Sequence, residues 1–217
     1  ESVLNYVENK EKLPQPSISA LDTILTLSGS LDVLENIASL IFYKEDVKKV
    51  KGKPVIVSET DLEASLRHLS CQIIINIINE ISISNETDSE SNLKLCRLFA
   101  AIPNLTSYLC LYINNIPKRL EDENRKDVTL IEGVWILKIL NLVLRYCPNG
   151  IPDLVANTTT MDIIFNSLLS VEQYTLYITQ LFSIVMENKN GVEYFISDTK
   201  YITSLLEVMN TTAEAIA

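Results

Sequence analysis

The sequence is poor in the residues from which most enzyme active sites are built. It has five glycines in 217 residues, at positions 29, 52, 133, 150 and 191, and no two of them fall within one short loop. Neither a Walker A loop nor a GxGxxG fingerprint can be written with them, which excludes the common phosphate- and dinucleotide-binding loops. The single histidine, His68, leaves little material for imidazole-based acid–base chemistry. We therefore expect a protein that is not an enzyme and that holds no cofactor.

Cysteine pairs and long hydrophobic runs are also lacking. The four cysteines, Cys71, Cys96, Cys110 and Cys147, form no CxxC pair, so a zinc knuckle or a thioredoxin-like motif is excluded. Their apolar neighbours predict buried free thiols, with two disulfides as the competing interpretation. Every apolar run is shorter than the roughly 18 residues that a membrane span needs. We expect no metal site, no membrane insertion and an intracellular location, with cytoplasm and nucleus equally open.

Positive charge is scarce, and its distribution limits the choice of partners. Lys and Arg number 18 against 28 Asp and Glu, so the net charge is −10. A surface of this sign repels phosphate, which argues against direct binding of nucleic acid and favours a protein partner with basic character. The one basic concentration, Lys44–Lys53, is interpreted as a solvated linker, although it could also touch an acidic partner. The acidic runs Glu86–Glu90 and Glu121–Glu123 are interpreted as solvated loops.

Apolar residues are plentiful, at 47% of the chain, and they recur at three- and four-residue intervals. This period predicts helices, including a long one over Leu62–Ile83. Three S/T-x-x-E/Q patterns precede apolar helical stretches, at Thr60–Glu63, Thr129–Glu132 and Ser170–Gln173. Each pattern fits a capping box, in which two side chains satisfy the first free amides of a helix. We expect a helix to begin at each of the three.

An internal repeat is present in the second half of the sequence. Residues Asn149–Thr158 align with Asn190–Thr199, so that Gly150 and Gly191 lie 41 positions apart (191 − 150). The predicted caps at residues 129 and 170 have the same separation (170 − 129). Glycine after a helix commonly adopts a left-handed conformation that lets the next helix pack back. We expect this role for both glycines.

The first half of the chain alternates less regularly. Asn92–Ile113 is predicted to be a returning helix pair, with an inserted loop at Ser84–Ser91 before it and a charged connecting loop at Ile116–Asp127 after it. Ile18–Ser28 and Leu31–Tyr43 are predicted to be a further helix pair. The chain begins at Glu1 without Met, so we expect a fragment of a longer protein.

The repeated unit resembles the armadillo repeat. Leu140–Gly150 followed by Ile151–Leu169, and Leu181–Asn190 followed by Gly191–Met209, match the family's long third helix, Asn-containing turn, short first helix and Leu-rich second helix. The resemblance implies an all-α fold, an armadillo-like solenoid of roughly four repeats. We expect a single domain over residues 1–217, with less regular repeats over 1–128 and clearer ones over 129–217.

The resemblance also implies a scaffold that binds a partner peptide or helix along a concave groove. The nuclear-import members carry a Trp-x-x-x-Asn ladder there, but Ile139 stands four residues after Trp135, and the neighbouring units have Leu66 and Leu176 in place of the Trp. That ladder is therefore not assigned to this chain. The predicted groove residues are instead the polar ones that interrupt the long helices: Gln72, Asn76, Asn79, Lys138, Asn141, Arg145, Gln180 and Ser183.

Other functions stay open at this point. The chain could instead recognise a small GTPase, as the armadillo-like parts of formins and some exchange factors do. A ligand-binding or catalytic pocket between helices is a third hypothesis, which the scarcity of His and Gly argues against. Homo-oligomerisation through the terminal repeats is a further expectation that the sequence leaves undecided.

Overall fold

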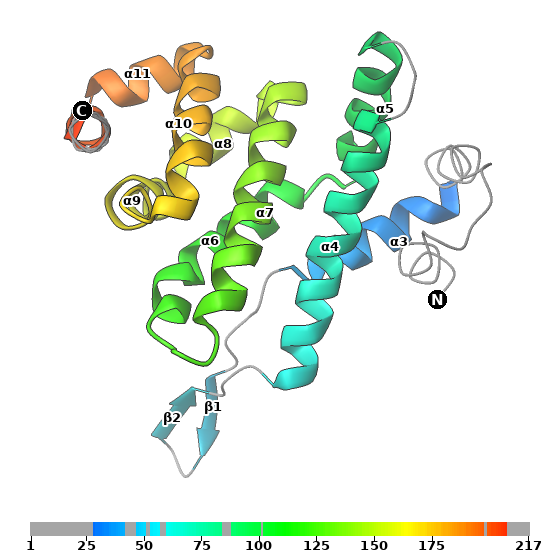
Figure 1. The fold of residues 1–217 in the computed structure, drawn as a ribbon, viewed down its shortest axis with the longest axis vertical. Coiled ribbons are helices and arrows are strands. Elements are labelled where there is room, and N and C mark those ends of the chain that lie inside the picture. The colour runs from blue at the N-terminus through cyan, green and yellow to red at the C-terminus, as the bar shows by residue number, and fades with distance from the viewer. Residues whose placement is uncertain are drawn as a thin grey trace. The chain divides into compact units, whose positions relative to one another are not determined.

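The computed structural model describes residues 28–41, 47–50, 53–56, 60–83, 88–100, 102–197 and 199–207 (Figure 1). Nearly all of these residues are helical, so the predicted all-α class is confirmed. The described part also contains one antiparallel hairpin, in which β1 (Val47–Val50) pairs with β2 (Lys53–Ile56). The linker predicted at Lys44–Lys53 is therefore wrong for residues 47–50 and for Lys53, which are paired in this hairpin. The valines of β1 and the Val-Ile end of β2 favour an extended chain.

The chain divides into two compact units, Glu1–Tyr108 and Leu109–Ala217. In the first unit, α3 (Ser28–Ser39) packs against α4 (Asp61–Ile83), and α4 packs against α5 (Asp88–Ala100). The earlier predicted helix at Ile18–Ser28 lies outside the described residues except for its last position. The single-domain organisation stays a prediction.

Helix α4 begins at the capping box that the sequence predicts. The Thr60 backbone amide donates to Glu63 Oε2 at 2.7 Å, and the Glu63 amide donates in return to Thr60 Oγ1 at 3.3 Å. Two otherwise free amides are thus satisfied at the start of the helix. Further along, Ile73, Ile74 and Ile78 are buried, so tertiary packing holds an isoleucine run that could otherwise be taken for a strand.

The predicted pair Asn92–Ile113 is present as α5 and α6 (Leu105–Leu120), but both helices extend beyond the predicted limits. Helix α5 begins inside the loop predicted at Ser84–Ser91, whose residues 84–87 lie outside the described part. The loop predicted at Ile116–Asp127 is wrong in extent, because α6 continues to Leu120. Although Pro117 removes one helical hydrogen bond, Ile113 and Ile116 on the same helix are fully buried, and their packing offsets that loss.

The second unit contains the rest of α6 and a series of long and short helices. They are α7 (Lys126–Tyr146), a 3₁₀ turn (Pro148–Gly150), α8 (Ile151–Ala156), α9 (Thr158–Asp162) continued by a π-helix (Ile163–Leu168), α10 (Glu172–Met186), α11 (Lys189–Ser197) and helical residues 200–207. Helix α10 packs along α7, and α11 packs against α8 (Figure 1). These are the elements that the 41-residue spacing relates.

Two of the three predicted capping boxes are wrong, although α10 does begin close to Ser170. Thr129 and Glu132 lie inside α7, which begins at Lys126, and they are 2% and 0% exposed. The Thr129 amide already bonds to the carbonyl of Arg125, so it needs no cap. Helix α10 begins at Glu172 after Val171, while the Ser170 hydroxyl donates to the carbonyl of Ser167. Short capping patterns also fit helix interiors when the helix starts one turn earlier.

The predicted left-handed glycines are also wrong. Gly150 has φ −79° and ψ −11°, which is an ordinary right-handed conformation. Gly191 lies within α11, where a β-carbon would overlap the carbonyl oxygen of Val185. At position 191 the lack of a side chain lets α11 approach the end of α10 closely, and no unusual backbone angle is involved.

A membrane span has requirements of both length and apolarity, and none of the described helices meets both of them on its own. Residues 91–100 and α6 meet them only when taken together, and the two are bent by 77° at the break between them.

Candidate functional site

The junction between α7 and α10 is organised by a glycine and a tyrosine. The fully buried ring of Tyr174 lies where a β-carbon of Gly133 would be, so the two helices meet closely at this point. The Tyr174 hydroxyl donates to the carbonyl of Thr129 at 2.8 Å. Gly133 and Tyr174 are 41 positions apart (174 − 133), which is the spacing of the sequence repeat.

A buried carboxylate joins α6 to the same part of α7. Glu132 is 0% exposed, and its Oε2 accepts a hydrogen bond from the Tyr112 hydroxyl at 2.7 Å. The Arg119 guanidinium lies 3.8 Å from the same oxygen and 5.4 Å from the centre of the Tyr112 ring. Burial, and then the nearby Glu132 charge, raise the pKa of Tyr174 far above its usual value, so this phenol stays protonated. The junction therefore contains one paired carboxylate and a neutral tyrosine.

Helix α7 exposes an apolar face next to this junction. Val128 and Ile131 are 45% and 49% exposed, and Trp135 is half-buried. The three residues follow an i, i+3, i+7 spacing and so share one side of the helix. On α10, Leu176 is 60% exposed, 41 positions after Trp135. We call Val128, Ile131, Trp135 and Leu176 the apolar face. Large apolar side chains left in solvent on one side of a helix, as Val128, Ile131 and Trp135 are on α7, are typical of an interaction surface.

Two predicted groove residues extend this side of α7. Lys138 is half-buried and Arg145 is exposed, and both follow Ile131 at intervals of seven residues. Gln180 and Ser183 are exposed on α10. The sequence prediction thus identified polar residues on the two helices, while it assigned Val128 and Ile131 no role at the surface. The apolar pattern of this helix is the same in the sequence whether these side chains are buried by other helices or exposed to solvent.

Asn141 requires a correction, because it does not face a groove. Its side chain is 6% exposed, and Nδ2 donates to the Tyr177 carbonyl of α10 at 2.9 Å. The side chain thus connects α7 to α10 and is not exposed in a groove where a peptide could bind it. Its Oδ1 atom is buried without a hydrogen-bond partner. A buried polar group that joins two helices looks identical, in sequence, to one that lines a groove.

The remaining predicted groove residues belong to the first unit. Gln72 is exposed on α4, whereas Asn76 and Asn79 are half-buried there, and their i, i+4, i+7 spacing places them on one side of that helix. His68 lies half-buried on the same helix. A role for these residues in partner binding stays a prediction.

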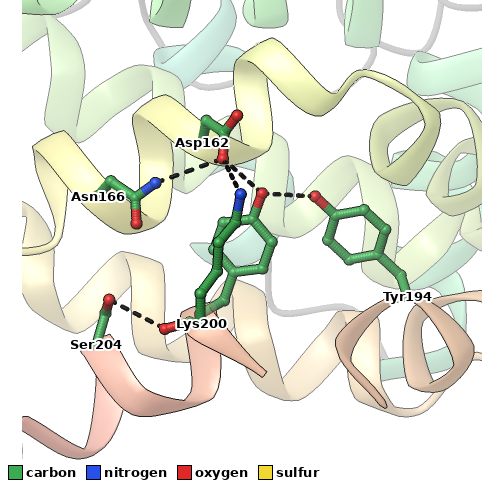
Figure 2. Close-up of polar contacts among 6 residues, drawn as sticks. Asp162, Asn166, Tyr194, Lys200 and Ser204 are labelled. Atoms are coloured by element: carbon green, nitrogen blue, oxygen red, sulfur yellow. Dashed lines mark hydrogen bonds and ion pairs between the residues drawn. The ribbon is translucent and has the colours of Figure 1, made fainter. Parts of the chain in front are cut away.

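A second polar cluster surrounds Asp162 at the end of α9, and the sequence prediction missed it (Figure 2). Asp162 Oδ1 accepts hydrogen bonds from Lys200 Nζ at 2.8 Å and from the Tyr201 hydroxyl at 2.6 Å. Asn166 Nδ2 lies 3.4 Å from the same oxygen, and the Tyr194 hydroxyl donates to that of Tyr201 at 2.9 Å. No short motif marks this cluster, since its members are brought together only by the packing of distant segments.

The electrostatics of the Asp162 cluster suit a structural contact. Hydrogen bonds from Lys200 and Tyr201 lower the pKa of Asp162, so the carboxylate is charged at neutral pH. Burial, with the hydrogen bond to Tyr201 next, raises the pKa of Tyr194 far above its usual value. The cluster therefore holds the charged Asp162 carboxylate, the Lys200 amino group that donates to it and a protonated Tyr194. It ties helical residues 200–207 to α9.

Among the residues that the structure describes, no group of three His, Cys, Asp or Glu side chains is close enough to hold a metal ion. No family model, curated protein or solved structure matches the chain significantly.

Proposed function

We propose that the chain is a protein-binding scaffold that takes a partner segment along the apolar face of α7 and α10. The observation that carries this proposal is the exposure of Val128, Ile131 and Leu176, at 45%, 49% and 60%. Each exposed large side chain leaves apolar area in water that a partner would remove from it, at roughly 25 cal/mol per Å². An extended segment or an amphipathic helix fits such a surface.

The packing of equivalent elements supports an armadillo-like arrangement for this scaffold. Helix α7 packs with α10 and α8 packs with α11, and the members of each pair are related by the 41-residue spacing. In a solenoid, each repeat contacts its neighbours through such equivalent elements. The Gly133–Tyr174 contact has the same register.

The polar side chains that are exposed on α7 and α10 indicate which chemical groups the partner segment should carry. Arg145, Gln180 and Ser183 are exposed on the same two helices as the apolar face. A guanidinium binds carboxylates or main-chain carbonyls, and amide and hydroxyl groups pair with an extended backbone. The net charge of −10 favours a basic partner at long range, while Arg145 acts only on the groups it touches. We propose an apolar segment with a carbonyl or carboxylate positioned for Arg145.

The test begins with a partner isolated by affinity capture and identified by mass spectrometry, and then measures binding to variants. Ile131→Asp and Leu176→Asp should each weaken binding at least about tenfold without lowering Tm, because both side chains are exposed in the free protein. Leu93→Asp is the matched control, because Leu93 is 52% exposed but lies on α5. Full affinity in both variants would refute the proposal. If the captured partner is instead a GTPase that binds only in its GTP form, the partner is a folded, nucleotide-dependent protein and not a linear segment.

A further inference from the structure

The hairpin of β1 and β2 carries a local charge opposite to that of the whole chain. Residues 47–56 contain four basic residues and no Asp or Glu, whereas the net charge of the chain is −10. The basic residues are Lys48, Lys49, Lys51 and Lys53. With the preceding Lys44, Glu45 and Asp46 included, residues 44–56 still have five lysines against two acids. Salt screens the more distant charges, so a group bound at the hairpin is governed mainly by this local excess of positive charge.

The two edges of the hairpin differ in the backbone groups that they offer. In an antiparallel ladder, opposite residues alternate between pairs that bond to each other and pairs whose N–H and C=O groups are directed outward. Lys49 is opposite Pro54, which has no N–H, so this pair is of the outward kind. Val47 and Ile56 are opposite each other two positions away and are therefore of the same kind. The outer edge of β1 thus offers both groups of Val47 and Lys49, while the outer edge of β2 lacks an N–H at Pro54.

The outer edge of β1 is suited to a third strand. In the part of the chain that the structure describes, the sheet consists of β1 and β2 alone (Figure 1). A strand edge with outward N–H and C=O groups is a template on which another extended segment can pair. An extended polypeptide satisfies both kinds of group, whereas a phosphate only accepts hydrogen bonds. The edge therefore suits a peptide segment better than the phosphates of a nucleic acid or a lipid.

The sequence of β1 specifies what an incoming strand should carry. It reads Val47-Lys48-Lys49-Val50, so the two central residues of the incoming strand lie opposite lysines and the two outer ones opposite valines. Opposite charges facing each other across a ladder stabilise the pairing, and like charges destabilise it. The complement is therefore apolar–acid–acid–apolar. Because β1 reads the same in both directions, this complement fits either orientation of the incoming strand.

We infer that β1 binds an extended acidic segment of a partner protein, with the pattern apolar–acid–acid–apolar, as a third strand of this sheet. Backbone hydrogen bonds to Val47 and Lys49 supply affinity, and acids opposite Lys48 and Lys49 supply specificity. A second copy of β1 would bring lysines opposite lysines, and no apolar–acid–acid–apolar run occurs in the 217 residues. The partner is therefore not another copy of this sequence.

The test is the binding of a fluorescently labelled peptide, Thr-Val-Glu-Glu-Val-Thr, to the full chain, measured by fluorescence anisotropy at low and at high salt. We expect it to bind at least about tenfold more tightly than Thr-Val-Lys-Lys-Val-Thr, and to be weakened by salt. The double variant Lys48→Glu with Lys49→Glu should reverse this preference. Its gain of binding to the lysine peptide would also show that the hairpin of the variant is folded.

A matched pair of proline variants tests the backbone edge. Val47→Pro removes an outward N–H from β1, and Ile56→Pro removes the outward N–H of the opposite residue on β2, while both keep every lysine. Val47→Pro should weaken binding of the glutamate peptide about two- to tenfold, which corresponds to one hydrogen bond. Ile56→Pro is the control and should leave this binding unchanged.

Four results would overturn the inference. The two peptides could bind equally, the charge-reversed variant could keep its preference for the glutamate peptide, or the two proline variants could have equal effects. Tighter binding of anionic lipid vesicles or single-stranded nucleic acid than of the glutamate peptide would assign the lysines to phosphate instead. Ile131→Asp should leave peptide binding unchanged, so the outcome at the hairpin is independent of the proposed partner-binding face.

Discussion

Tyr174 occupies the space that a side chain at Gly133 would need, and the two residues are one repeat length apart. The ring is 0% exposed, and its hydroxyl is fixed by the Thr129 carbonyl at 2.8 Å. The tyrosine therefore cannot move aside without losing both packing and a buried hydrogen bond. The close approach of α7 and α10 depends on the absence of one β-carbon.

Substitution Gly133→Ala should destabilise the protein even though it improves helix propensity. Alanine favours a helix over glycine by about 1 kcal/mol, but forcing a methyl group into a filled core costs about 1–3 kcal/mol. We expect a net loss of up to about 2 kcal/mol in the free energy of unfolding, measured by urea denaturation. Gly150→Ala is the control, since Gly150 already has right-handed angles, and it should be neutral or stabilising. Equal effects of the two substitutions would show that the contact with Tyr174 is unimportant.

The buried carboxylate of Glu132 gives a second prediction. Tyr112→Phe removes the hydroxyl that donates to Glu132 at 2.7 Å and should lower the free energy of unfolding by about 1.5–3 kcal/mol. Adding Glu132→Gln should recover part of this loss, because burying a neutral amide costs less free energy than burying a carboxylate that has lost a hydrogen-bond donor. Tyr177→Phe, on a half-buried tyrosine of α10, serves as the control and should change stability little. An additive double variant would show that Tyr112 and Glu132 are not coupled.

Acid should weaken the contact between α9 and helical residues 200–207. The pKa of Asp162 is lowered in the folded protein by Lys200 and Tyr201, so its contribution to stability is present above the ordinary aspartate pKa. This contribution is lost as the pH falls through the lowered value. In Asp162→Asn, Tm should therefore fall less steeply than in the wild type below about pH 4. The effect is small, because the side chain is 46% exposed. Asp153→Asn, on α8, is the control, and a curve parallel to the wild type for Asp162→Asn would contradict the prediction.

The four free cysteines should differ in reactivity. Cys71 and Cys110 are buried, while Cys96 and Cys147 are half-buried. Burial also raises the pKa of Cys110 to about 11, so little thiolate forms at neutral pH. We expect Cys96 and Cys147 to be alkylated in the native protein and Cys71 and Cys110 only after unfolding, as read by peptide mass spectrometry. Equal rates for all four in the native state would contradict the burial assigned to them.

The sequence predicts the helices far better than the side-chain roles. Periodicity identifies the long helices, and the 41-residue spacing anticipates that α7 meets α10. A pattern such as Thr129–Glu132 misleads because Glu132 accepts a hydrogen bond from Tyr112, which lies 20 residues away on another helix. Asn141 misleads for a similar reason, since its partner is a main-chain carbonyl of α10. Contacts between helices decide both roles, and no local pattern records them.

The order of contacts along the second unit has a consequence for how it folds. Hydrogen bonds between its helices join residues at moderate separations, such as Tyr112 with Glu132 (20 positions), Asn141 with Tyr177 (36 positions) and Thr160 with Asn114 (46 positions). The entropy of closing a loop grows only with the logarithm of its length, so these junctions form at similar cost. No junction among them requires the two ends of the unit to meet first. Folding can therefore start at any junction and spread to its neighbours. Under mild denaturant we expect amide hydrogen exchange to be fastest over residues 200–207, with α6 and α7 still protected.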